Sequence, residues 1–114
     1  MVIPMSSASA RVRSHLERFR SALEQRFGVR LRRVQLFGSH ARGEARAESD
    51  VDILVVVDAL TRGERDEVID LAVDLDLERF VGLSPLAMST AHYERLHTLE
   101  AGLVLAIERE GVMV

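Results

Sequence analysis

The feature that most constrains the fold is a nearly continuous apolar run, Asp52-Ile53-Leu54-Val55-Val56-Val57. Four of its six side chains are β-branched, and such side chains favour extended backbone. Beyond Asp52 the run has no polar face to turn towards water. It therefore predicts a strand that is buried on both faces of a sheet, as happens where other elements cover the sheet.

Hydrophobic periodicity predicts the elements around this strand. Apolar residues recur every three or four positions from Val12 to Phe27, which predicts a helix capped by Ser9 and ended by Gly28. Strands are predicted over 31–37, 52–57 and 81–88, and helices over 64–78, 91–97 and 100–110. Residues 73–78 also alternate as a strand would, but the helical pattern before them favours a helix. Pro85 favours an edge position for the last strand.

These elements predict an α/β fold, a small mixed sheet with helices packed on it. The chain has 114 residues, enough for one hydrophobic core but not for two. We expect a loose leader over residues 1–8 and a single domain over residues 9–114. No apolar run approaches the ~20 residues of a membrane span, and no secretion signal is recognisable at the start. The chain has no cysteine, which excludes disulfides, thiolate metal sites and a cysteine nucleophile. A cytoplasmic protein is expected.

The basic residues, all of them Arg, are unevenly distributed. Residues 1–46 carry ten Arg and three acidic residues, whereas residues 47–114 carry five Arg and fifteen acidic residues. An Arg-rich half could form a nucleic-acid-binding module. That hypothesis is the weaker one, because the chain has only four Phe and one Tyr for base stacking. It also leaves a pair of aspartates unexplained.

The chemistry is concentrated in two short segments, Gly38-Ser39 after the first predicted strand and Asp50-Val51-Asp52 before the second. A glycine turn lets backbone N–H groups approach a phosphate closely, and a serine hydroxyl adds a donor. Asp50 and Asp52 are two residues apart, so their carboxylates point to the same face of a strand. Two such carboxylates suit Mg²⁺, which completes its shell with water and substrate phosphates. Together the segments predict metal-assisted phosphoryl or nucleotidyl transfer.

The sequence Gly38-Ser39-His40-Ala41-Arg42-Gly43, followed by Ser49-Asp50-Val51-Asp52, resembles the signature of the minimal nucleotidyltransferases. These belong to the DNA polymerase β-like nucleotidyltransferase superfamily. The resemblance implies that Gly38 and Ser39 bind the β- and γ-phosphates of an NTP, with ATP the expected donor. It implies that Asp50 and Asp52 hold Mg²⁺ or Mn²⁺, that Arg42 braces the loop or faces a phosphate, and that Gly43 completes the turn.

The resemblance also implies an activity and a partner. Members of the family transfer a nucleoside monophosphate to an acceptor and release pyrophosphate. Some bacterial members of this size pair with a helical HEPN protein, and in some pairs the nucleotidyltransferase is an antitoxin that attaches AMP to its toxin. At this length there is little room for an acceptor-binding domain, so we expect the acceptor site to be completed by a partner or by a second copy of the chain.

One expected residue is missing. The family usually carries a third carboxylate on a later strand, where it completes the metal site and acts as a base. The predicted strand 81–88 contains no acidic residue, and Gly82 stands at the expected position. Asp74, Asp76 or Glu78 could substitute only if the strand assignment is wrong or if the end of the preceding helix leans towards the site. An alternative function is therefore a catalytically degenerate nucleotide-binding or antitoxin-like subunit.

Overall fold

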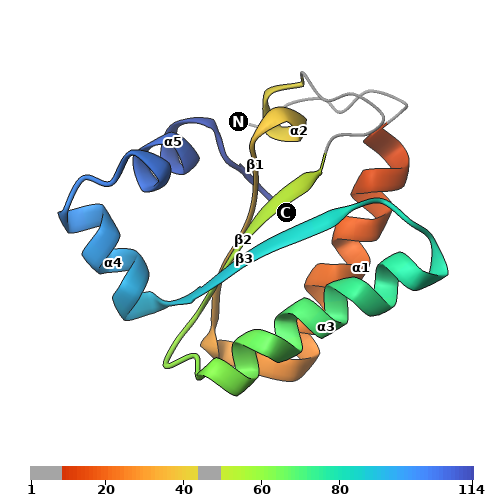
Figure 1. Ribbon diagram of the computed structural model, residues 1–114, viewed down its shortest axis with the longest axis horizontal. Coiled ribbons are helices and arrows are strands. Elements are labelled where there is room, and N and C mark those ends of the chain that lie inside the picture. Colours follow the sequence, from red (N-terminus) through yellow and green to blue (C-terminus); the bar gives the residue numbers. More distant parts are fainter. Residues whose placement is uncertain (1–8, 44–49) are drawn as a thin grey trace.

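The computed structural model describes residues 9–43 and 50–114; the predicted leader and Ser49 of the motif lie outside these ranges. Within them, a sheet of four strands has the order β3-β2-β1-β4, and helices lie on both of its faces (Figure 1). No helix among these residues is long and apolar enough to cross a membrane. The elements, in chain order, are α1 (Ser9–Phe27), η1 (Gly28–Arg30), β1 (Leu31–Phe37), α2 (Ser39–Arg42), β2 (Val51–Val57), α3 (Arg62–Glu78), β3 (Leu83–Ser89), α4 (Thr90–Thr98), α5 (Gly102–Glu110) and β4 (Val112–Met113).

The predicted α/β fold with a mixed sheet is confirmed. Strand β2 pairs antiparallel with β1 and parallel with β3. Every residue of β2 except Asp52 is buried, so the strand is covered on both faces as its sequence predicts. Strand β3 is at an edge of the sheet, where Pro85 interrupts no pairing on the open side.

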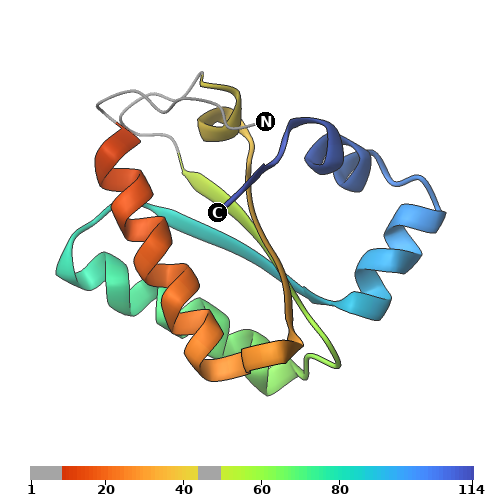
Figure 2. The same ribbon diagram turned by 180° about the vertical axis from the view of Figure 1, so that it is seen from behind.

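The two faces of the sheet are covered by different helices. Side chains of Val51, Ile53, Val55 and Val57 pack in one cluster with α1 and α3, whereas those of Leu54 and Val56 pack in a second cluster with α4 and α5. Figure 2 shows the same three layers from behind, with α4 and α5 on the side of the sheet away from α1. Since side chains alternate along a strand, Asp52 belongs to the face covered by α4 and α5, and Asp50 lies just before the strand.

Several element boundaries differ from the predictions by one or two residues, and two of these differences have a clear physical cause. Helix α3 begins at Arg62 because Thr61 and Glu64 form a reciprocal capping box. Helix α5 begins at Gly102, two residues later than predicted, because Glu100 has a φ of +53°. Strand β4, which pairs through two residues with β1, was not predicted. A strand this short has no period of its own and exists only through its pairing.

The capping box is part of an ion-pair cluster at the end of the sheet where β2 finishes. The guanidinium of Arg30 donates two hydrogen bonds of 2.8 Å to the Glu64 carboxylate. The same side chain donates to the carbonyl oxygens of Asp58 and Ala59. Arg30 therefore links η1 to the β2–α3 connection and to the first turn of α3. The hydrogen bonds that Arg30 donates to Glu64, followed by the bond from the Thr61 N–H, lower the pKa of Glu64 from 4.5 to about 2.

This shift predicts a pH dependence of stability. Because the folded-state pKa of Glu64 is below its unfolded value, the stabilisation is fully present above about pH 5 and is lost as the pH falls towards 2. We expect the difference in free energy of unfolding between wild type and Glu64→Gln to shrink over that interval. Urea titrations at a series of pH values measure it. Glu67→Gln, which removes only the exposed pair with Arg26, should show a smaller change.

Candidate active site

The glycine turn of the motif lies directly against one of the two aspartates. Gly38 follows β1 with a φ of +76°, a conformation that L side chains rarely adopt. A Cβ atom at this position would overlap Oδ2 of Asp52. Two independent constraints therefore require glycine, one from the backbone and one from the neighbouring carboxylate. Helix α2 begins at the next residue, Ser39; the side chains of Ser39 and Arg42 lie outside what the structure describes.

Strand pairing sets the position of the two aspartates. Asp52 lies opposite Phe37 of β1 and opposite Ser84 of β3. Asp52 is half-buried, and Asp50, just before the strand, is exposed. The Asp52 carboxylate lies next to the glycine turn, whereas Asp50 lies beside Gly82, just before β2. Two carboxylates that are exposed or half-buried fit a divalent cation, because such a cation binds a few carboxylate oxygens and keeps water or phosphate in its remaining positions.

Gly82 lies beside Asp50, just before β3. Its carbonyl oxygen accepts a 2.8 Å hydrogen bond from the N–H of Val51. A Cβ atom added to Gly82 would lie 3.8 Å from Oδ1 of Asp50 and 3.7 Å from Cζ of Phe80. The position expected to carry a third carboxylate is thus next to the aspartate pair. It holds a residue with no side chain and a φ of +85°.

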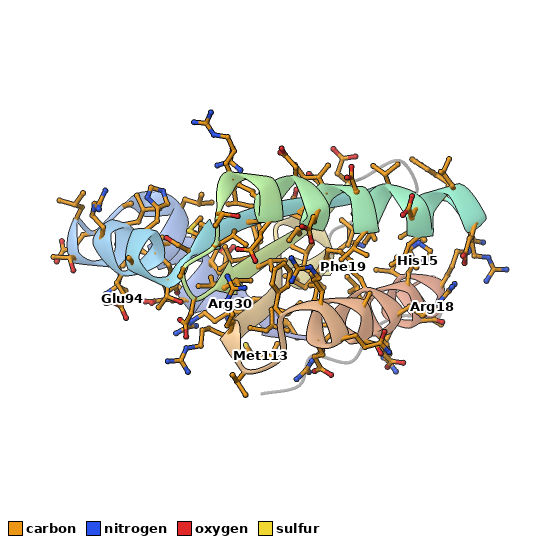
Figure 3. The ribbon with its side chains drawn as sticks, turned by 90° about the horizontal axis from the view of Figure 1, so that it is seen from below. His15, Arg18, Phe19, Arg30, Glu94 and Met113 are labelled. Atoms are coloured by element: carbon orange, nitrogen blue, oxygen red, sulfur yellow. The ribbon has the colours of Figure 1, made fainter. Side chains whose placement is uncertain are left out.

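The acidic side chains at the end of α3 are engaged elsewhere. The Asp76 carboxylate accepts hydrogen bonds from the N–H groups of Val81 and Leu83, at 3.2 and 3.0 Å. It also lies 3.3 Å from Nε2 of buried His15, which makes no hydrogen bond to the described residues. Asp76 therefore fixes the α3–β3 connection, and Figure 3 shows His15 between α1 and α3.

Glu78 likewise has a structural partner, Arg18 of α1, at 2.6 Å. Within residues 9–43 and 50–114, no three His, Asp or Glu side chains gather into a group that could hold a metal. For the residues described, the site therefore has two carboxylates rather than three.

One residue of this neighbourhood, Phe80, was not among the predicted site residues. It joins α3 to β3, and its side chain is 76% exposed although its ring contacts the Gly82 position. No periodicity marks a residue between two elements, so only a large apolar side chain next to Gly82 could have drawn attention to it. An open hollow lined by Arg20, Arg32 and Met113 contains none of the motif residues, and we assign it no role.

Comparison with protein families and curated proteins gives consistent results. The model of the nucleotidyltransferase domain family matches residues 16–100. A proposed protein adenylyltransferase of Methanocaldococcus jannaschii is 34% identical over 97 residues, which cover 79% of this chain and 93% of that protein. Protein adenylyltransferase MntA of Thermococcus cleftensis is 33% identical over 103 residues, which cover 90% of this chain and 92% of that protein.

Solved structures resemble the chain over nearly its whole length. A proposed minimal nucleotidyltransferase is 28% identical, with a TM-score of 0.62 over 91% of this chain and 93% of that one. A proposed nucleotidyltransferase of Sulfolobus solfataricus is 20% identical, with a TM-score of 0.56 over 99% of this chain and 89% of that one. The second likeness shows a shared fold alone.

Proposed function

This chain belongs to the nucleotidyltransferase domain family, and from that premise we propose that it transfers a nucleoside monophosphate from an NTP to a protein acceptor. The resemblance expected from the motif is thereby confirmed. Two relatives that align over most of their own length carry the name of protein adenylyltransferases. Those names support ATP as the donor and a protein as the acceptor.

In the proposed mechanism, the residues of this chain position the triphosphate. The backbone N–H groups of the Gly38–Ser39 turn and the Ser39 hydroxyl bind the β- and γ-phosphates. Asp50 and Asp52 hold a divalent cation, Mg²⁺ or Mn²⁺, which when bound neutralises charge on the phosphates. Arg42 braces the turn or faces a phosphate. The turn and the carboxylates together orient the α-phosphorus for in-line attack by an acceptor hydroxyl and departure of pyrophosphate.

We further propose that the acceptor is a separately encoded helical protein of the HEPN type, as in a toxin–antitoxin pair, and that the pair acts in the cytoplasm. An acceptor could approach Asp50 beside Gly82, because residue 82 has no side chain that would intervene. A second copy of the chain is the other acceptor to be tested.

A second candidate function is nucleotide binding without turnover. It is favoured by Gly82 next to Asp50 and by the commitment of Asp76 and Glu78 to structural contacts. Without a base to deprotonate the acceptor, the rate falls by ~10²–10⁴-fold. The two candidates share the phosphate and metal sites and differ in catalysis.

The contact between the Gly38 turn and Asp52 carries the proposal, and Gly38→Ala tests it. The added methyl group must displace the Asp52 carboxylate or the turn. We expect NTP affinity in the presence of Mg²⁺ to fall by about tenfold or more, because one displaced charge-assisted hydrogen bond is worth roughly 1.5–3 kcal/mol. Titration calorimetry measures the affinity.

Gly28→Ala is the matched control for the backbone. Gly28 also has a positive φ, +56°, but no atom lies within 4 Å of an added Cβ. Both variants should lose stability through the left-handed conformation, by roughly 1–2 kcal/mol, and only Gly38→Ala should lose NTP binding. Equal NTP affinity of the two folded variants would contradict the assignment of the turn.

A further inference from the structure

Helix α3 carries an exposed apolar stripe that the fold does not use. The stripe consists of Ile69, Val73 and Leu77, which are 43%, 50% and 79% exposed. Residues four apart lie on one side of a helix, so the three side chains form a continuous row. Scattered single apolar residues are normal on a protein surface, whereas a row along one helix is typical of an interaction site.

The contacts of α3 show which way the stripe faces. Val68 and Ala72 are buried against the sheet, and Glu67 and Glu78 pair with Arg26 and Arg18 of α1. Ile69 is two residues after Glu67, which is about half a turn of helix. The stripe therefore lies on the side of α3 away from α1. Figure 3 shows α3 alongside α1, with side chains of α3 projecting away from it.

The stripe leads towards the candidate active site. Its exposure increases from Ile69 to Leu77, and three residues later comes Phe80, 76% exposed. The Phe80 ring contacts the Gly82 position, which in turn is 3.8 Å from Oδ1 of Asp50. A molecule seated on the stripe and on Phe80 would therefore end beside Asp50.

Charge determines which kind of molecule fits. Asp66, Asp70 and Asp74 are exposed along α3, and Asp70 and Asp74 each follow a residue of the stripe directly. The exposed Arg62 and Arg65 precede the stripe and Arg79 follows it, so the charges directly beside its middle are the two aspartates. A second copy of the chain docked α3 against α3 would bring its own aspartates into the same contact, and like charges oppose such a contact. A partner with Arg or Lys beside its apolar row is complementary.

We propose that the stripe, together with Phe80, is the docking surface for a partner protein that presents an amphipathic helix flanked by basic residues. A straight row with four-residue spacing matches the ridges and grooves by which helices pack. The inference rests on the proposed function in one respect: the docked partner is taken to be the acceptor protein. Docking itself does not require transfer, so the two are separable.

Two synthetic helical peptides of about 18 residues, long enough to be helical in water, provide the test. Both have Leu every three or four positions; one has Lys beside the Leu row and the other has Glu. Fluorescence anisotropy should show that the basic peptide binds at least about tenfold more tightly at low salt, with the difference shrinking as salt is added. Asp70→Asn with Asp74→Asn should remove most of that difference.

Val73→Ser with Leu77→Ser should weaken binding of the basic peptide about tenfold or more, because it removes two exposed apolar contacts. Val29→Ser with Leu99→Ser, at exposed positions of other elements, is the matched control and should leave binding unchanged. All four positions are exposed, so unchanged circular dichroism is expected. Asp52→Asn should still bind the peptide, which separates failure of docking from failure of nucleotide transfer.

Three results would overturn the proposal. The first is failure of the basic peptide to bind at millimolar concentration. The second is equal affinity for both peptides, which would show no preference for basic partners. The third is self-association of the wild-type chain in analytical ultracentrifugation that Val73→Ser with Leu77→Ser abolishes, because the stripe would then be covered by a second copy.

Discussion

Replacing both Asp50 and Asp52 by Asn is expected to abolish the divalent-metal-dependent part of NTP binding while leaving the chain folded. Asn keeps the size of each side chain but removes the charge that binds a hard cation. Loss of a residue that only hydrogen-bonds to a metal ligand typically lowers metal affinity 10–100-fold. Loss of both carboxylates should therefore lower the affinity for NTP with Mg²⁺ by more than about a hundredfold. Titration calorimetry with and without EDTA measures this effect.

A control must remove the same charge elsewhere. Asp66→Asn with Asp70→Asn removes two exposed carboxylates from α3, so the net charge changes equally, and NTP affinity should stay within about twofold of wild type at physiological salt. If the Asp50 and Asp52 double variant were folded and bound NTP with unchanged metal dependence, the metal would have to be held by other residues.

The second large effect is a gain of activity in Gly82→Asp. The wild-type chain alone is expected to release pyrophosphate slowly, since a missing general base costs ~10²–10⁴-fold in rate. An Asp side chain fits the space, because its Cβ would meet Phe80 and Asp50 only at ordinary contact distances of 3.7 and 3.8 Å. The left-handed backbone, with a φ of +85°, costs about 1–2 kcal/mol of stability, and Asp tolerates it better than most residues.

Gly82→Asn separates the base from the backbone. It has nearly the same shape and the same strain but no carboxylate, so only Gly82→Asp should release pyrophosphate faster. The assay uses each NTP with Mg²⁺ or Mn²⁺, for the chain alone and with a candidate acceptor protein. The gain should require the cation, because without it the new carboxylate would face Asp50 and the two like charges would repel each other. Rapid turnover by the wild-type chain alone would contradict the prediction.

Much of the fold could be predicted from the sequence because its signals are local. The β-branched run of β2 needs cover on both faces, and the row from Val12 to Phe27 can be buried only as a helix. The ambiguous residues 73–78 form a helix, as the pattern before them predicts. The Thr61–Glu64 capping box was missed, although Thr followed three residues later by Glu marks a helix start, so α3 was predicted to begin two residues late. Strand β4 could not be predicted, because a strand of two residues has no hydrophobic pattern.

The sequence by itself determined that this chain has an α/β fold, belongs to the nucleotidyltransferases and carries the residues Gly38, Asp50 and Asp52. Only the tertiary structure decided how these residues meet. Strand pairing brings Gly38 against Asp52 and Gly82 against Asp50, although more than ten residues separate each pair in sequence. The tertiary structure also decided the partners of Asp76 and Glu78, two acidic residues close to Gly82 in sequence. Asp76 accepts a backbone hydrogen bond in the α3–β3 connection and Glu78 pairs with Arg18 of α1, so neither completes the site. The physical reason is that a side chain's partners depend on which elements pack together, and no local pattern of residues records that choice.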